Sequence, residues 1–199
     1  MEYLNKEKRN GKILFLGYDK NESKLISETL KMGFTVFHTK KVISELSDFD
    51  LVVSFGYKEI LKSSTLSTSK NPVVNLHISY LPFNRGMYPN FWSHFDGTPN
   101  GVTIHIIDAG IDTGPILLQK QTYFGKSEKT FRETWKKLTQ EIEQLFLTNF
   151  SGIYSQQIIP KKQEGSGSFH KASDLPLEFG GWDTVIEKEI ARLKRIKLD

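Results

Sequence analysis

Hydrophobic residues along this chain fall into short runs that are separated by polar or helix-like segments. Residues 12–16 form the first run, and residues 20–32 follow with hydrophobic side chains at helical spacing. Residues 34–37 and 51–53 form two further runs of strand length. This alternation of strand-like and helix-like segments predicts parallel strands with helices packed against the faces of the sheet.

The second half of the chain continues this alternation. Its predicted strands and helices are a strand at 72–76, a helix at 88–95, strands at 101–107 and 116–119, a long helix at 127–150 and a last helix at 183–197. Ser127 and Thr130 are both available to cap the long helix. The expected fold is α/β, with a Rossmann-like, mostly parallel sheet flanked by helices. We divide the chain into a core at residues 1–150 and a short C-terminal extension at residues 151–199, which we expect to pack on the core or on a partner subunit.

Composition narrows the possible functions. A chain of 199 residues with 38% hydrophobic and 25% charged residues suits one globular domain. A net charge of +4 is small for a nucleic-acid-binding surface, so a nucleic-acid partner is not expected. The absence of cysteine excludes disulfides, thiolate metal sites and cysteine nucleophiles. No signal peptide or membrane span is visible, so we expect a cytoplasmic protein without a membrane partner.

Three polar residues stand at the ends of strand-like runs. Asn75 and His77 are two residues apart, so both side chains project to the same side near the end of one strand. Asp112 follows the run at 101–107. An amide, an imidazole and a carboxylate suit acyl transfer, in which an oxyanion is stabilised and a proton is removed, and no metal is needed. The alternative for each is structural: a packed histidine, a turn asparagine and a turn carboxylate.

The segments around these residues share several motifs with a known family. They contain Asn-x-His, Ser-x-Leu-Pro with a downstream glycine, Gly-x-Thr-x-His and Asp-x-Gly-x-Ile. The matching residues are Asn75, His77, Ser79, Leu81, Pro82, Gly86, Gly101, Thr103, His105, Asp112, Gly114 and Ile116. In these motifs the chain resembles the formyltransferases that depend on 10-formyltetrahydrofolate, over residues 12 to roughly 150. The resemblance implies the formyltransferase fold and 10-formyltetrahydrofolate as the cofactor.

The resemblance also implies which residues form the site. Asn75, His77 and Asp112 would be catalytic: Asn75 would donate to the oxyanion, His77 would accept the amine proton or, as imidazolium, stabilise the oxyanion, and Asp112 would orient the imidazole or relay the proton. His105 fits a family position, but a structural histidine is an equal alternative. The residues implied for cofactor binding around the pterin are Phe55, Gly56, Tyr57, Glu59, Ile60, Leu61, Asp108, Ala109 and Gly110.

Differences between branches of the family bear on the acceptor. The enzyme that acts on phosphoribosylglycinamide carries a glycine-rich phosphate loop after its first strand, and this chain lacks that loop. The initiator-tRNA enzyme carries an additional C-terminal barrel domain of about a hundred residues, whereas only about fifty residues follow residue 150 here. The sequences of residues 81–93 and 163–175 resemble those of a third branch, whose enzymes formylate nucleotide-linked amino-deoxysugars for surface polysaccharide such as lipopolysaccharide O-antigen. Asn84, Arg85 and Gly86 would then bind substrate, although Arg85 is equally well explained as a turn cation.

The expected substrate is therefore a dTDP- or GDP-linked amino sugar, and relatives of this branch imply a homodimer. Two alternatives remain at this point. One is an enzyme like methionyl-tRNA formyltransferase without its C-terminal barrel. The other belongs to a different class: a folate-binding module without catalytic activity.

Overall fold

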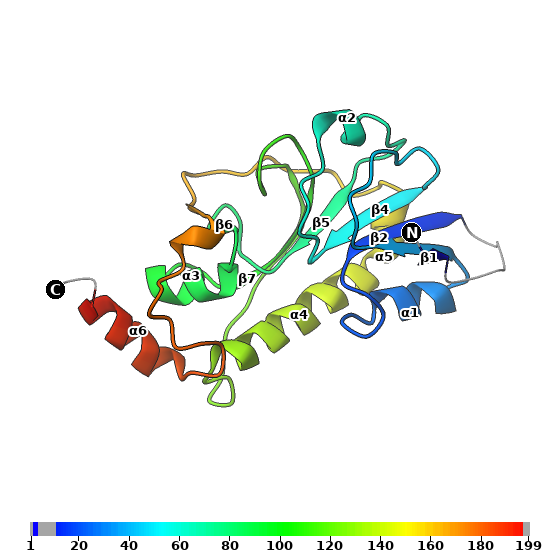
Figure 1. Cartoon of the computed structure of the whole chain (residues 1–199). Helices are drawn as coiled ribbons and strands as arrows, with labels where there is room; N and C mark the ends of the chain where they lie inside the picture. The colour runs from blue at the N-terminus through cyan, green and yellow to red at the C-terminus, as the bar shows by residue number, and fades with distance from the viewer. Residues whose placement is uncertain (1, 4–10, 197–199) are drawn as a thin grey trace.

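A mixed seven-stranded sheet forms the centre of the molecule (Figure 1). The computed structural model describes residues 2–3 and 11–196, and residues 1, 4–10 and 197–199 lie outside the described part. The strands of this sheet, in spatial order, are β1 (Glu2–Tyr3), β3 (Thr35–Thr39), β2 (Lys12–Gly17), β4 (Leu51–Phe55), β5 (Val74–His77), β7 (Gly101–Ile106) and β8 (Ile116–Gln121). A second, two-stranded sheet joins β6 (Arg85–Gly86) to β9 (Phe169–His170).

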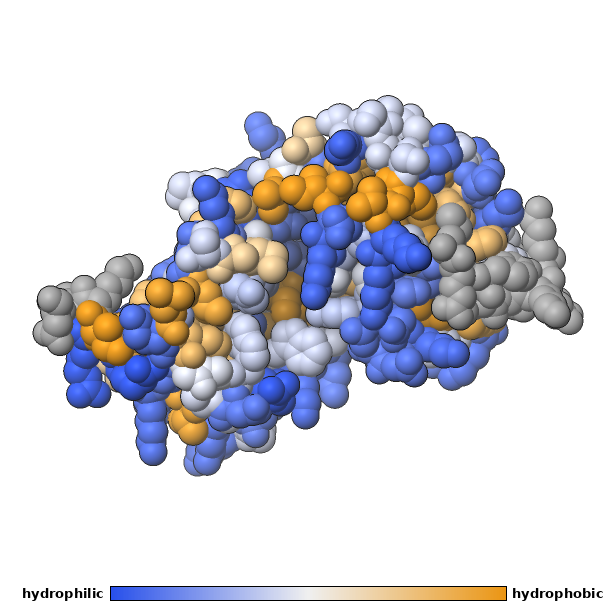
Figure 2. Space-filling model, in the orientation of Figure 1, coloured by the Kyte–Doolittle hydropathy of each residue, from blue (hydrophilic) through white to orange (hydrophobic). Residues whose placement is uncertain are grey.

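Helices connect and cover these strands. They are α1 (Leu25–Lys31), α2 (Ser63–Leu66), α3 (Pro89–Asp96), α4 (Phe131–Thr148), α5 (Phe150–Tyr154), a 3₁₀ turn (Ala172–Asp174) and α6 (Ile186–Ile196). None of the helices in the described part of the chain is both long and apolar enough to cross a membrane. On the face shown in Figure 2 the surface is largely hydrophilic, with hydrophobic groups visible over α6 and in a band below α2.

The four central strands, β3, β2, β4 and β5, are parallel, which confirms the predicted α/β class. On the far side of β5 the direction changes, because β7 is antiparallel to β5 and β8 is antiparallel to β7. The β7–β8 connection, residues 107–115, is too short for the crossover of a dozen or more residues that a parallel pair needs. The predicted strands at 101–107 and 116–119 are thus found, and their antiparallel direction sets the geometry of the site.

Helix α4 covers one face of the sheet. Phe146 lies on this helix, is fully buried and meets the ring of Phe15 from β2 edge to face, with 6.4 Å between the ring centroids. The helix begins after Thr130, whose hydroxyl accepts from the backbone N–H of Glu133 while the Glu133 carboxylate accepts from the N–H of Thr130. Of the two predicted caps, Thr130 is therefore the one used, because only it has a glutamate three residues later to complete the capping box.

The C-terminal residues contribute to a separate hydrophobic cluster beside the sheet. Phe91 of α3, Phe131 at the start of α4 and Leu193 of α6 are buried together, and Phe179 and Trp182 pack against them. Arg132 also donates its Nη2 to Asp183 at 2.9 Å. These contacts hold residues beyond 150 against α3 and α4, whereas the division into a core and an extension stays a prediction.

The large ring in the core gives the first prediction. Replacing Phe146 with alanine removes a fully buried ring between α4 and β2, so the free energy of unfolding is expected to fall by about 3–5 kcal/mol. Urea denaturation followed by circular dichroism measures this change. Tyr123→Ala is the matched control, because Tyr123 is 75% exposed and its loss is expected to change stability by no more than about 0.5 kcal/mol.

His94 gives a prediction for acid stability. Its ring on α3 lies 5.3 Å from the ring of Phe124, and burial lowers its pKa from 6.5 to about 4. The unfolded chain therefore binds a proton more readily than the folded protein between these values, and stability must fall as the pH drops from about 6.5 to about 4. His94→Gln cannot take up that proton, so its loss of stability over this range is expected to be smaller by on the order of 1–3 kcal/mol. Equal slopes for the two proteins in urea denaturation at several pH values contradict this account.

Candidate active site

The carboxylate of Asp112 stands at the centre of a polar cluster. Its Oδ2 accepts from the backbone N–H of Gly86 at 2.8 Å and lies 3.7 Å from Nδ1 of His77. Its Oδ1 accepts from Nδ2 of Asn75 at 3.1 Å and lies 3.3 Å from Nε2 of His105. The side chain is only 13% exposed. The structure thus brings together the three residues predicted to be catalytic, and it adds His105.

Pairing in the sheet explains why these groups meet. Asn75 and His77 are on β5, and the antiparallel register places His105 of β7 directly opposite Asn75. Opposite residues project to the same face, so their side chains come close, and Nδ2 of Asn75 lies 3.1 Å from Nε2 of His105. The loop after β7 then folds back and delivers Asp112 with a left-handed backbone, φ +52°. His105 is accordingly part of the cluster and is also packed in the core.

The hydrogen bond of His77 indicates which ring nitrogen carries the proton when the imidazole is neutral. Nε2 lies 3.1 Å from the backbone carbonyl of Asn84, which can only accept, so Nε2 carries the proton. The lone pair of neutral His77 is therefore on Nδ1, the atom that faces Asp112. Burial lowers the pKa of His77; the Asp112 carboxylate raises it in part, and the nearby His105 lowers it. The imidazole is held as a neutral proton acceptor.

Asp112 is held in the opposite state. Burial by itself raises the pKa of this carboxyl, but the His77 imidazole, the contact with His105 and the N–H of Gly86 together outweigh burial and leave the pKa well below its usual range. Asp112 is thus ionised when His77 is neutral. A proton taken up by Nδ1 of His77 would immediately face a negative charge, which stabilises it.

The loop that includes Asn84, Arg85 and Gly86 closes the cluster on one side. The side chain of Asn84 is fully buried: Nδ2 donates to the hydroxyl of Thr98 at 2.7 Å, and Oδ1 accepts from the hydroxyl of Ser168 at 3.1 Å. Asn84 therefore acts on the cluster through its carbonyl, which holds His77. Gly86 has φ +88°, a conformation that favours glycine.

A residue near the C-terminus also supports the cluster. Nε2 of Gln163 donates to the carbonyls of Asp112 and Gly114, each at 2.8 Å, and so holds both ends of the turn that carries the carboxylate. Neither Gln163 nor Ser168 was predicted as a site residue. Both lie in the segment 163–175 that resembles one branch of the family, but that resemblance did not indicate their partners, which lie about 50 and 80 residues earlier in the chain.

The segment predicted to bind the cofactor after β4 is partly internal. Phe55 is buried and its ring lies 4.9 Å from that of Tyr18. Gly56 has φ +68°, and a Cβ there would lie 2.5 Å from atoms of the Tyr18 ring. The ring that approaches the backbone at Gly56 is thus that of Tyr18, which the sequence did not indicate.

Four other residues of this segment differ in exposure. Leu61 is buried in a second hydrophobic cluster, against which Ile107 also packs. It is therefore a core residue as well as a candidate for the wall of the cofactor site. The hydroxyl of Tyr57 donates to the carbonyl of Lys41 at 2.9 Å. Glu59 is exposed, and Ile60 is an apolar side chain 76% exposed.

The second segment predicted for the cofactor is a surface turn. Oδ1 of Asp108 accepts from the N–H of Gly110 at 3.0 Å and from the hydroxyl of Thr113 at 2.6 Å, so Asp108 holds its own turn. Ala109 and Gly110 are exposed. The turn leads directly into Asp112, which places this segment next to the polar cluster around that carboxylate.

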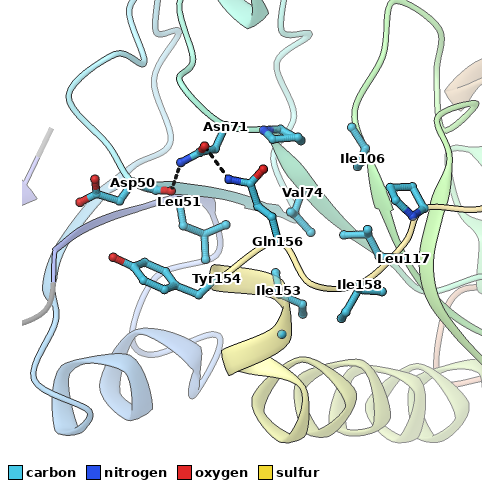
Figure 3. A pocket seen from close by; sticks show the side chains of 13 residues that line it. Asp50, Leu51, Asn71, Val74, Ile106, Leu117, Ile153, Tyr154, Gln156 and Ile158 are labelled. Carbon is cyan, nitrogen blue, oxygen red and sulfur yellow. Dashed lines mark hydrogen bonds between the residues drawn. The ribbon is translucent and has the colours of Figure 1, made fainter.

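A hollow of about 140 Å³ lies elsewhere, at the ends where β4 and β5 begin (Figure 3). Nδ2 of Asn71 donates to the carbonyl of Asp50, and Nε2 of Gln156 donates to Oδ1 of Asn71. No residue predicted for catalysis or binding lines this hollow. The side-chain amides of Asn71 and Gln156 are therefore used in hydrogen bonds within the fold.

Sequence comparisons point to one family. The profile of the family described as "Formyl transferase" matches residues 26–149. The methionyl-tRNA formyltransferase of Clostridium botulinum is 32% identical over 166 residues, which cover 78% of this chain and 53% of that protein. The dTDP-4-amino-4,6-dideoxyglucose formyltransferase of Mycobacterium tuberculosis is 29% identical over 136 residues, which cover 68% of this chain and 57% of that protein. The chain thus spans about half the length of the curated relatives it matches.

Solved structures share the fold. The formyltransferase PseJ from Anoxybacillus kamchatkensis, solved with UDP-4,6-dideoxy-4-formamido-L-AltNAc and tetrahydrofolate, aligns with a TM-score of 0.83 and 36% identity over 92% of this chain and 99% of PseJ. A sugar N-formyltransferase from Shewanella aligns with a TM-score of 0.69 at 20% identity over 90% of this chain and 85% of its own, which shows the common fold. The family profile covers more than half of this sequence, and the architecture agrees with it: the chain belongs to the formyl transferase family.

Proposed function

We propose that this protein is an N-formyltransferase that moves the formyl group of 10-formyltetrahydrofolate to the amino group of a nucleotide-linked amino-deoxysugar. The observation that carries the proposal is the cluster of Asn75, His77 and Asp112, in which a neutral imidazole faces an ionised carboxylate beside an amide donor. Formyl transfer to an amine needs these three capacities.

The loops beside the cluster suit a flat folate ring. Ile60 is an exposed apolar side chain on one loop, and the exposed turn at Ala109 and Gly110 lies on the other, next to Asp112. A pterin covering Ile60 would remove this side chain from water, and a turn without large side chains leaves its backbone accessible. When bound, 10-formyltetrahydrofolate supplies the formyl group.

The residues of the cluster divide the chemistry between them. With the folate bound, the acceptor amine would form a bond to the formyl carbon as the bond from that carbon to N10 breaks, and Nδ1 of His77 would accept one amine proton and return it to N10. Asn75 gives up one of its hydrogen bonds within the protein, to Asp112 or to His105, and donates instead to the formyl oxygen as that oxygen becomes negative. Asp112 stabilises the transient imidazolium, and the bond from Nε2 to the carbonyl of Asn84 keeps the ring in place.

The choice of acceptor rests on similarity. PseJ, 36% identical and aligned over nearly its whole length, was solved with a UDP-linked 4-formamido sugar, which suggests a UDP-linked 4-amino sugar for this protein. The relative from Mycobacterium tuberculosis, at lower identity, bears the name of a dTDP-4-amino sugar enzyme. We therefore propose UDP as the first candidate for the nucleotide of the acceptor and dTDP as the second. GDP, which was also expected from the sequence, comes third. A homodimer and a cytoplasmic location stay predictions.

The alternative of a methionyl-tRNA formyltransferase-like enzyme has weaker support. The relative of this kind from Clostridium botulinum is 32% identical over 78% of this chain, against 36% identity over 92% of this chain for PseJ. A non-catalytic folate-binding module has no need of Asn75, His77 and Asp112 in mutual contact. Assays with charged initiator tRNA and with a panel of UDP-, dTDP- and GDP-linked amino sugars separate these possibilities.

Replacing either titratable group tests the catalytic assignment. His77→Asn and Asp112→Asn are each expected to lower formyl transfer about 10²–10⁴-fold, because the proton acceptor or its counter-charge is lost. Production of the formamido sugar from the amino sugar, followed by mass spectrometry, measures the loss. Circular dichroism and binding of 5-formyltetrahydrofolate report whether the fold and the donor site remain intact.

Asp48→Asn is a matched control for these variants, since Asp48 is an exposed carboxylate remote in sequence from the cluster. It is expected to retain full activity. Turnover by His77→Asn at the level of this control contradicts the assignment, as does full retention by Asp112→Asn.

The pKa shifts predict the pH dependence. The neutral form of His77 is the proton acceptor and its pKa is lowered, so kcat/KM is expected to decline on the acid side only below pH 6.5. The carboxylate of Asp112 raises the pKa of His77, so Asp112→Asn should move the His77 titration to still lower pH. NMR titration of the His77 ring in both proteins measures this shift, and movement to higher pH contradicts the proposed pairing.

A further inference from the structure

Residues 161–170, which we call the C-terminal strap, run across the catalytic loops. The strap begins where Lys161 and Ile116 exchange backbone hydrogen bonds of 2.7 and 2.8 Å. It ends at β9, which pairs in parallel with β6. The N–H of Arg85 donates to the carbonyl of Ser168 at 3.0 Å, and the N–H of Met87 to that of His170 at 2.9 Å. The strap is thus fixed by its backbone against the loop that carries Gly86.

A hollow of about 310 Å³ lies between the strap and the turn that carries Asp112. The residues that line it are Arg85, Ile111, Thr113 and Phe169. Arg85 precedes Gly86, whose N–H binds the catalytic carboxylate, and Ile111 and Thr113 flank Asp112 itself. The hollow therefore opens beside the atoms proposed to receive the acceptor amine, on the side of the 84–86 loop.

Two walls of the hollow are apolar and exposed. Phe169 is 44% exposed and Ile111 is 45% exposed, although most large hydrophobic residues of the described chain are buried. The ring of Phe169 lies against Gly86, where a Cβ would come within 2.9 Å of it. A flat aromatic group entering the hollow can cover both side chains and remove them from water.

Arg85 brings a positive charge to the wall of the hollow. Nη2 of Arg85 donates to the carbonyl of Ser166 at 3.0 Å, which holds the guanidinium at the strap, while Nε is buried and has no hydrogen-bond partner. A buried donor without a partner is costly, and an anionic oxygen is its best acceptor. Charge and apolar area thus occur together at one hollow.

We propose that this hollow binds the nucleoside diphosphate part of the acceptor, with the base against Phe169 and Ile111 and the diphosphate on Arg85. The inference rests on the proposed function and assigns it a specific subsite. The sugar then extends from the diphosphate past Gly86 toward Asp112 and His77. On this assignment the C-terminal strap provides substrate affinity, because Phe169 belongs to it, and the cluster on β5 and β7 provides the chemistry.

Titration of the protein with UDP and with uridine, by calorimetry, tests the subsite. Phe169→Ala is expected to weaken UDP about tenfold or more, the loss typical of one base–aromatic contact, and Phe169→Trp to restore it. Arg85→Ala is expected to weaken UDP more than uridine, because uridine lacks the phosphates. In turnover, Phe169→Ala should raise KM for the sugar nucleotide about tenfold and leave kcat and the affinity for 5-formyltetrahydrofolate near those of the parent.

Tyr123→Ala is the matched control, since it also removes an exposed aromatic ring but does not line the hollow. Parent-like UDP binding by both Phe169→Ala and Ile111→Ala overturns the subsite. The proposed function fails separately, if the parent formylates no sugar nucleotide of the panel. UDP binding that weakens in Phe169→Ala still supports the hollow in that case, so the two failures are distinguishable.

Discussion

The buried carboxylate of Asp112 is the constraint on which the site depends. An ionised group that is 13% exposed is stable only if the protein replaces the water it has lost. Nδ2 of Asn75 and the N–H of Gly86 donate hydrogen bonds that supply part of that replacement, and the imidazoles of His77 and His105 surround the carboxylate. Because these partners come from β5, from β7 and from the loop of Gly86, the carboxylate also fixes the distances between these parts. The geometry needed for chemistry is therefore the same geometry that makes the buried charge tolerable.

The change of strand direction after β5 makes this arrangement possible. In the parallel part of the sheet, neighbouring strands deliver loops to the same edge. Reversing β7 instead places His105 opposite Asn75, and the short β7–β8 loop brings Asp112 back over the pair. The C-terminal strap then closes the site from outside: Gln163 holds the turn of Asp112, and β9 holds the loop of Gly86.

Much of the fold follows from local patterns. The strands and helices of the core lie close to their predicted places, because hydrophobic periodicity depends on neighbours a few residues apart. The first helix is shorter than expected, Leu25–Lys31 instead of residues 20–32, since residues 20–24 form a turn around Asp19 and Glu22. The direction of β7 and β8 was not predictable in this way, because either direction presents the same apolar faces to the core.

For the site, the sequence by itself singled out Asn75, His77 and Asp112, which the structure brings into contact, and it pointed to the family, because these residues lie in short motifs with fixed spacing. Only the tertiary structure revealed that Tyr18 covers Gly56, that the side chain of Asn84 is buried and that Gln163 holds the turn of Asp112. It also decided the proton positions on His77, through a carbonyl seven residues away. The physical reason is range: motifs record what one segment must contain, whereas hydrogen bonds across 50 to 80 residues form only when the sheet has set both ends in place.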